Sequence, residues 1–341
     1  MRTLKFVLIA LVIAYLFTGS DRFTRLQDTK WVVHTELSSN HQERPTQPKI
    51  LMNSTFLVGP IDNLKWTIIS RLKSAKKRIF LSVYMLTDPD IIQALIAAKE
   101  RGMMVRVILE PSVYLLPKIN KKAYALLDTA GVEVRYSSER DFNFNHSKYF
   151  IIDQTLLLGT GNMTKSSLVQ NREFFVGTDS LSEVNFLANL FEHDAEHMSM
   201  FEPENSLVVS PLNARNTIRS LINGAKKSIT LMSESLSDAQ VVDLLVAAKS
   251  RGLSISVCLP DDRPLWAVQK TQLQKAWARL LISRKPHVHA KTLLVDNQKL
   301  LVGSINFTDN SIDRNREVSI IISGNTIIQR YNKIIASDCK G

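Results

Sequence analysis

The sequence predicts an α/β protein made of two duplicated halves, in which mixed β-sheets are flanked by helices. The first observation is a repeat at an offset of 150 residues, where Ala75-Lys76-Lys77 matches Ala225-Lys226-Lys227 and residues 97–102 match residues 247–252. The second is an alternation of short apolar strands with helices of about ten to thirteen residues, which favours parallel strands covered by helices. Two units of roughly 140 residues are each large enough to be a domain. We therefore expect a gene duplication whose halves pack as a pseudo-twofold pair.

The first half shows this alternation in order. Apolar spacing predicts a helix, a strand, a second helix and a second strand at residues 64–75, 78–84, 89–101 and 105–109. Alternating residues then predict a hairpin of strands 148–153 and 155–158, and a helix over 183–200 closes the half. Gly102 follows the second helix directly, and we interpret it as a C-cap.

The second half repeats the order. A helix, a strand, a second helix and a second strand are predicted at residues 217–225, 228–232, 239–251 and 255–259. Gly252 is the matching C-cap. These matches place repeat 1 at residues 59–203 and repeat 2 at residues 204–341.

Each half also carries the same set of polar residues. The members are a histidine and a lysine two residues apart, an aspartate five residues later, an asparagine in a glycine-containing turn, and a glutamate 11 residues after that asparagine. The first set is His146, Lys148, Asp153, Asn162 and Glu173, and the second is His289, Lys291, Asp296, Asn306 and Glu317. One short motif is weak evidence, but two extended copies indicate a shared active site at the interface between the halves.

The residue types suit attack on a phosphodiester. On a strand, His146 and Lys148 point to the same face, as do His289 and Lys291. A phosphodiester carries a negative charge that repels nucleophiles, and the two lysines with the two turn asparagines can neutralise it without a metal. One imidazole can attack phosphorus while the other protonates the leaving oxygen. We therefore predict neither a metal nor a cofactor.

The carboxylates of the two sets divide into two groups. Glu173 and Glu317 are candidates to hold the imidazole tautomers, the role of the third member of a catalytic triad. Asp153 and Asp296 lie on the opposite strand face by parity, so we expect them to support the motifs structurally.

With these residues the chain resembles a two-motif member of the phospholipase D superfamily, over about residues 60–335. That superfamily includes phospholipases D, cardiolipin and phosphatidylserine synthases, and nucleases. The resemblance implies a reaction through a phosphohistidine intermediate, with His146 as nucleophile and His289 as general acid and then general base. The symmetry of the two motifs does not by itself assign these roles.

The first copy departs from the pattern usual in the family. Asp296 precedes Gly303 by seven residues, whereas Asp153 precedes Gly159 by six, and the first copy has GTGN where GSxN is usual. We expect the first hairpin to be one residue shorter, with Asn162 still reaching the site.

Composition narrows the class of substrate. The net charge of +11 implies attraction to anions, whether phospholipid headgroups or nucleic acid. Two fused motifs and a cationic body favour phospholipid at a membrane surface, in an enzyme active as a monomer. The alternative is a metal-independent nuclease, because residues 89–109 also resemble compact nucleases of the superfamily, which usually carry one motif per chain and dimerise.

The N-terminus predicts export. Arg2 and Lys5 precede an apolar run over residues 6–17, which is shorter than the roughly 20 residues that span a bilayer as a helix. We interpret residues 1–20 as a signal peptide or membrane anchor and residues 21–58 as a linker that leads to an entry strand. The protein is then expected outside the cytoplasm, in the periplasm or secreted.

Three further features have less specific interpretations. Cys258 and Cys339 are too few to predict a disulfide framework, and neither lies in a nucleophile motif. His193 and His197 belong to an H-x-x-E-H pattern that is typical of zinc peptidases on a helix, but we favour a surface or interfacial helix. Residues 265–281 carry Trp266 and Trp277 among basic residues on a predicted helix, which suits a lipid interface, a nucleic-acid groove or inward packing of the tryptophans.

Overall fold

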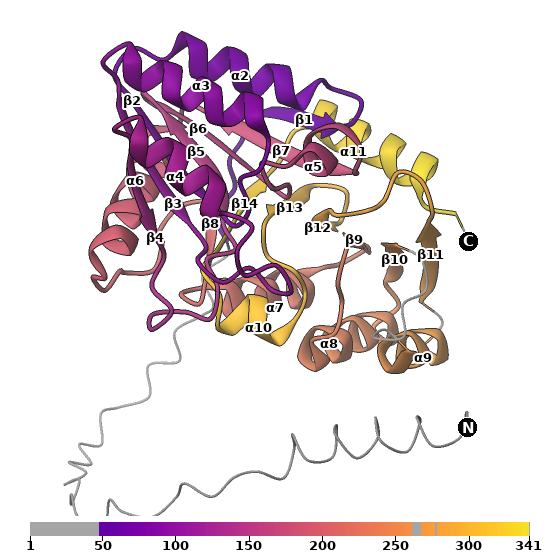
Figure 1. Cartoon of the computed structure of the whole chain (residues 1–341). Helices are drawn as coiled ribbons and strands as arrows, with labels where there is room; N and C mark the ends of the chain where they lie inside the picture. Colours follow the sequence, from indigo (N-terminus) through magenta and orange to yellow (C-terminus); the bar gives the residue numbers. More distant parts are fainter. Residues whose placement is uncertain (1–47, 261–266, 277, 341) are drawn as a thin grey trace, which may run out of the picture. The chain divides into compact units, whose positions relative to one another are not determined.

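The computed structural model describes residues 48–260, 267–276 and 278–340, which belong to one compact unit. Within these ranges the chain forms two sheets of seven strands each (Figure 1). The first sheet contains, in spatial order, β1 (Thr55–Gly59), β7 (Glu173–Thr178), β6 (Thr155–Gly159), β5 (Lys148–Ile152), β2 (Arg78–Val83), β3 (Met104–Leu109) and β4 (Glu133–Tyr136).

The second sheet has the same order of equivalent strands. It contains β8 (Leu207–Ser210), β14 (Glu317–Ile322), β13 (Lys299–Gly303), β12 (Lys291–Val295), β9 (Ser228–Ser233), β10 (Ser254–Pro260) and β11 (Arg279–Ser283). In each sheet the last three strands pair in parallel and the others in antiparallel fashion. The predicted duplicated α/β fold with mixed sheets is confirmed.

Helices cover the outer face of each sheet. A core on the first sheet is formed with α2 (Leu64–Ser74), α3 (Pro89–Glu100), α4 (Lys121–Thr129) and α5 (Lys165–Val169). The second sheet is covered in the same way by α7 (Ala214–Gly224), α8 (Ala239–Ser250), α9 (Ala267–Lys275) and α10 (Asp309–Asp313).

The inner faces of both sheets share a third core with two helices, α6 (Leu181–Glu196) and α11 (Asn325–Asp338). Phe174 of β7 and Val318 of β14 belong to this core, so apolar residues of both halves are buried together. Burial of apolar area is the main favourable term in folding, and this shared core holds the halves in one unit.

Local signals set the ends of most elements where the sequence predicts them. Asp88 caps α3 by accepting hydrogen bonds from the backbone N–H groups of Asp90 and Ile91. The helix ends before Gly102, whose φ of +85° belongs to the left-handed region that glycine adopts without strain. Gly252 ends α8 in the same way with φ +90°. The entry strand is β1, which begins inside the segment expected to be a linker.

Two predicted helices end earlier than expected. The helix predicted over 183–200 ends at Glu196, because His197 takes a left-handed φ of 57°. The helix predicted over 265–281 is α9, and its last predicted residues instead form β11, which extends the parallel part of the second sheet. Trp266 and Trp277 lie outside the described residues.

One expectation for the cysteines was wrong, because the two are joined to each other. Cys258 of β10 and Cys339 form a disulfide, with Cα atoms 5.8 Å apart, although 81 residues separate them. After α11 the chain runs beside β11, where Lys340 and Ile282 exchange backbone hydrogen bonds of 2.9 and 3.2 Å. This pairing brings Cys339 to β10, a proximity that a count of two cysteines cannot reveal.

Within the described ranges, none of the helices has the length and apolar character needed to cross a bilayer. The predicted signal peptide or anchor at residues 1–20 lies outside those ranges. The boundaries at residues 58 and 203 stay predictions.

Candidate active site

Both histidine motifs lie where each half pairs with the other. His146 comes two residues before β5, and its backbone N–H donates to the carbonyl of Arg316 over 2.8 Å. In the second motif the N–H of Arg172 donates to the carbonyl of His287 (2.8 Å), and the N–H of His289 donates to the carbonyl of Arg172 (3.2 Å). Each histidine segment therefore forms a short bridge with the Asn-Arg-Glu segment of the other half.

The arginines of these segments extend the exchange between the halves. Arg316 donates to both carboxylate oxygens of Asp194 on α6 over 2.9–3.1 Å, and Arg172 donates to Asp338 on α11. All four side chains are buried. Each arginine thus binds the closing helix of the opposite half, and the bidentate geometry fixes its orientation.

The histidine–glutamate pairs are crossed as well. Nδ1 of His146 lies 2.9 and 3.0 Å from the carboxylate oxygens of Glu317, and Nδ1 of His289 lies 2.8 Å from Oε1 of Glu173. Ser311 donates to Glu317 over 2.7 Å, and Thr160 donates to Glu173. Each imidazole therefore faces a carboxylate of the other half, and the contact at His146 is a hydrogen bond.

The surroundings of His146 keep its ring neutral. Burial disfavours the imidazolium, Glu317 opposes this effect and Lys148 adds to it, and together they lower the pKa of His146 to about 4. Because Glu317 can only accept, the neutral ring carries its proton on Nδ1. Nε2 then has a free lone pair and can act as a nucleophile.

The two lysines are buried beside the histidines. Lys148 and Lys291 are each 1% exposed, and each Nζ donates to the backbone carbonyl of its own motif histidine. Burial and the positive charge of Lys291 lower the pKa of Lys148 to about 7, against the opposing effect of Glu317. Buried positive charge of this kind favours binding of a phosphate group.

The turn asparagines occupy equivalent positions in spite of the different spacing. The first hairpin pairs Ile152 with Thr155 across two residues, whereas the second pairs Val295 with Lys299 across three. The prediction of a shorter first hairpin is therefore confirmed. After each turn the chain forms a β-bridge with the segment that follows β2 or β9. Met163, next to Asn162, pairs with Leu86, and Phe307, next to Asn306, pairs with Leu236.

The glycine before Asn162 in GTGN has a steric reason. A Cβ on Gly161 would lie 2.9 Å from the carboxyl carbon of Glu173, so a side chain at this position would displace the glutamate. Among the described residues, the side-chain oxygens of Asn162 and Asn306 have no hydrogen-bond partner. These oxygens can only accept, so the Nδ2 groups of the same amides are the atoms that can donate to a bound phosphate.

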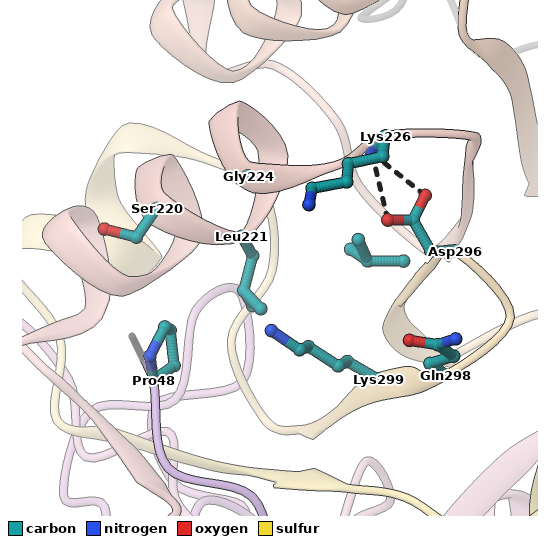
Figure 2. Close-up of a pocket in the computed structure, with 9 residues that line it drawn as sticks. Pro48, Ser220, Leu221, Gly224, Lys226, Asp296, Gln298 and Lys299 are labelled. Carbon is teal, nitrogen blue, oxygen red and sulfur yellow. Dashed lines mark hydrogen bonds between the residues drawn. The ribbon is translucent and has the colours of Figure 1, made fainter. Parts of the chain in front are cut away.

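Asp153 and Asp296 lie away from the histidines, at the opposite ends of β5 and β12. The Asp153 carboxylate accepts from the backbone N–H groups of residues 76–78 over 2.7–3.1 Å, and Asp296 does the same for residues 226–228. Figure 2 shows Asp296 and Lys226 at a pocket of about 280 Å³ whose lining includes neither histidine. Both aspartates therefore fix the turn between a helix and a strand.

The comparisons with known proteins agree with this geometry. A family model described as cardiolipin synthase, PLD-like domain, matches residues 68–195 and 218–339, more than half of the chain. The chain belongs to this family. The match covers both motifs, so the predicted membership of the phospholipase D superfamily is confirmed.

Individual relatives support the same assignment. A phospholipase D of Rickettsia conorii is 27% identical over 168 residues, which cover 48% of this chain and 82% of the relative. The major cardiolipin synthase of Bacillus subtilis is 25% identical over 318 residues, which cover 80% of this chain and 66% of the relative. A phosphatidylserine synthase from Haemophilus influenzae has the same fold, with a TM-score of 0.69 at 14% identity over 87% of this chain and 89% of that protein.

Two residues beside the histidines were missed by the sequence analysis. The ring of Tyr84 packs edge-on against His146 with centroids 4.6 Å apart, and Glu234 approaches both His289 and Lys291. They occupy equivalent places, directly after β2 and β9. The offset of 150 residues relates Tyr84 to Glu234, so a comparison of the first residue after each of these strands would have identified both.

The candidate zinc motif does not assemble as a helical pair. Because α6 ends at Glu196, His193 and His197 point to different partners: the carbonyl of Ser199 and the carboxylate of Asp141. Elsewhere in the described ranges, Asp238, Asp309 and Asp313 come within 4.8 Å of one another. The guanidinium of Arg215 donates to Asp238 and Asp313 and supplies the positive charge there.

Removing the charge of Asp194 should destabilise the protein more than a surface substitution. In Asp194→Asn the buried guanidinium of Arg316 loses its counter-ion, which should lower the free energy of unfolding by roughly 3–5 kcal/mol. Urea denaturation measures the change. Asp243→Asn, on the exposed face of α8, is the matched control and should stay within about 0.5 kcal/mol of wild type. Equal stability of the two variants would show that the ion pair of Arg316 with Asp194 does not stabilise the packing of the two halves.

Proposed function

We propose that the protein is a phosphodiesterase of the phospholipase D type, which cleaves or transfers phosphatidyl groups through a phosphohistidine on His146. Nε2 of His146 attacks phosphorus, while Lys148, Lys291 and the turn asparagines neutralise the negative charge of the phosphate. His289 protonates the leaving oxygen and then accepts a proton from water or an acceptor alcohol. The family membership supports this chemistry, and the curated relatives do not favour the nuclease alternative.

One surface feature supports a lipid substrate over nucleic acid. Tyr114, Leu115 and Leu116 form an apolar loop after β3 and are 70%, 80% and 48% exposed. The loop is joined to the active site, because the N–H of Tyr114 donates to the hydroxyl of Tyr84 over 2.7 Å. The ring of Tyr84 in turn packs on His146. Exposed apolar residues in a group mark interaction surfaces.

Charge beside the apolar loop suits an anionic bilayer. Lys118, Lys121 and Lys122 follow the loop and are exposed. Basic residues at a membrane surface each contribute about 1 kcal/mol of attraction to anionic lipid. The loop would enter the headgroup region, with these lysines at the surface and the histidines close behind.

The substrate class is tested with vesicles of phosphatidylglycerol and phosphatidylcholine, run beside single- and double-stranded DNA and RNA. Wild type should hydrolyse lipid, and added ethanol should divert the product into phosphatidylethanol, because an alcohol competes with water for the phosphohistidine. His146→Ala and His289→Ala should each abolish both products. Mass spectrometry of the lipids detects them. Turnover of nucleic acid without lipid turnover would establish the nuclease alternative.

The apolar loop has its own test. Leu115→Asp should weaken binding to these vesicles about tenfold or more, because insertion of a leucine contributes roughly 1.5–3 kcal/mol. In this variant the fold-loss of lipid turnover should be at least about ten times larger than the fold-loss of turnover on soluble bis(p-nitrophenyl) phosphate. Leu181→Asp, at an exposed position of α6 outside the loop, is the matched control. Equal losses in the two variants would show that the loop does not dock on lipid.

A plot of kcat/KM against pH should be bell-shaped, with its maximum on the acidic side of neutrality. Attack requires neutral His146, with a pKa of about 4, so kcat/KM should rise as pH increases through that value. Phosphate binding requires charged Lys148, with a pKa of about 7, so kcat/KM should fall as pH increases further. Steady-state kinetics on bis(p-nitrophenyl) phosphate measures both limbs. Lys148→Arg keeps its charge at every pH tested, and its remaining activity should lose the alkaline fall.

Export is part of the proposal. Disulfides persist in oxidising compartments, so the pairing of Cys258 with Cys339 supports a location outside the cytoplasm, as does the N-terminal pattern of residues 1–20. When a thiol-blocking reagent is added to intact cells before lysis, mass spectrometry should find both cysteines unlabelled. A labelled pair in a cytoplasmic fraction would contradict export.

A further inference from the structure

One position breaks the symmetry of the active site. Tyr84 and Glu234 are equivalent in the repeat, yet the first offers an aromatic ring and the second a carboxylate. The Tyr84 ring lies at 70° to the His146 imidazole. Burial, opposed by the bond from the Tyr114 N–H, raises the pKa of Tyr84 to about 12, so its hydroxyl stays neutral. The two histidines therefore face different charges.

Glu234 lies on the nitrogen of His289 that would have to attack a phosphate. Its Oε2 is 3.3 Å from Nε2 of His289 and 3.2 Å from Nζ of Lys291. Nδ1 of the same ring lies 2.8 Å from Oε1 of Glu173, so each ring nitrogen of His289 faces a carboxylate. His146, within the described part of the chain, has a carboxylate only at Nδ1.

The Glu234 carboxylate is ionised at neutral pH. Burial opposes its ionisation, but the neighbouring His289 and Lys291, whose ammonium donates a hydrogen bond to Glu234, outweigh that effect and hold the pKa of Glu234 below its usual value. A carboxylate can only accept, so a ring nitrogen that faces one carries its proton on that side. A protonated nitrogen has no lone pair to attack phosphorus, but it can donate a proton.

We propose that Glu234 gives the two histidines their different roles: it keeps Nε2 of His289 protonated and unable to attack, and so leaves His146 as the nucleophile. The inference rests on the proposed phosphohistidine route and deepens it. Glu234 is a positioning residue in this scheme, because it acts through His289. Repeat 1 has no such carboxylate at the equivalent place, where Tyr84 stands.

The assigned roles balance in both steps. In the first, the Nε2 lone pair of His146 forms the N–P bond, the P–O bond to the leaving group breaks, and the proton on Nε2 of His289 moves to the leaving oxygen. In the second, the oxygen of water or an alcohol forms a bond to phosphorus, its proton returns to Nε2 of His289, and the N–P bond breaks. The Glu234 carboxylate then faces an imidazolium again.

The test asks whether His289 can attack once Glu234 is neutralised. The probe is bis(p-nitrophenyl) phosphate, because p-nitrophenolate leaves without being protonated and no lipid is needed. Full-length His146→Asn, with and without Glu234→Gln, is mixed with the probe and quenched rapidly. Mass spectrometry then locates the phosphoryl adduct. Adduct accumulates in this background because the variant lacks a second histidine to activate water.

We expect little adduct on residue 289 in His146→Asn and about tenfold more or higher in the double variant, since Glu234→Gln removes the carboxylate that faces Nε2 and accepts its proton. Glu234→Tyr, which installs the residue of repeat 1, should also release His289. His146→Asn with Glu100→Gln is the matched control, because Glu100 is exposed on α3, and it should label no more than His146→Asn.

Equal labelling of residue 289 with and without Glu234 would overturn the assignment, and so would a double variant that stays unlabelled. His289→Asn separates this result from the proposed function: it should accumulate adduct on residue 146 whatever stands at position 234. Absence of that adduct would overturn the phosphohistidine route itself, and the role of Glu234 with it.

Discussion

The active site depends on the exchange of one short segment between the two halves. The backbone of each histidine segment pairs with the Asn-Arg-Glu segment of the opposite half, and the arginine between them binds a buried aspartate on the opposite closing helix. A buried guanidinium without its partner would be costly, so the pairs restrict how the halves can dock. The same contact carries Glu173 to His289 and Glu317 to His146. Docking of the halves and assembly of the site are therefore one event.

This dependence explains the electrostatics of the site. The lysines approach each other because the halves meet at their motifs, and burial with this repulsion moves the pKa of Lys148 to about 7. A phosphodiester would bring a negative charge into the same volume and relieve both effects. The backbone is repeated closely, whereas the charge is not, since Tyr84 and Glu234 face different histidines. A duplicated scaffold can therefore hold two unequal imidazoles.

Much of this architecture could be predicted from neighbouring residues. Helix α3 begins at its Asp88 cap and ends before Gly102, because capping and left-handed backbone are local preferences. The six-residue spacing between Asp153 and Gly159 predicted a hairpin one residue shorter, and the strand register confirms it. The pairing of His146 with Lys148 on one face followed from strand parity. The end of α6 was predicted wrongly, because the left-handed turn at His197 has no glycine to announce it.

The sequence by itself determined the duplicated fold, the two motif sets and the family, because each motif depends on spacing within a few tens of residues and the whole pattern recurs about 150 residues later. Only the tertiary structure decided which glutamate serves which histidine, that Arg172 and Arg316 bind Asp338 and Asp194, and that the two cysteines are joined. The partners in these pairs lie 81 to 171 residues apart. Their contacts depend on how the sheets and closing helices dock through a shared apolar core, and burial of apolar area is non-directional. Local preferences therefore select the elements, while docking selects the partners.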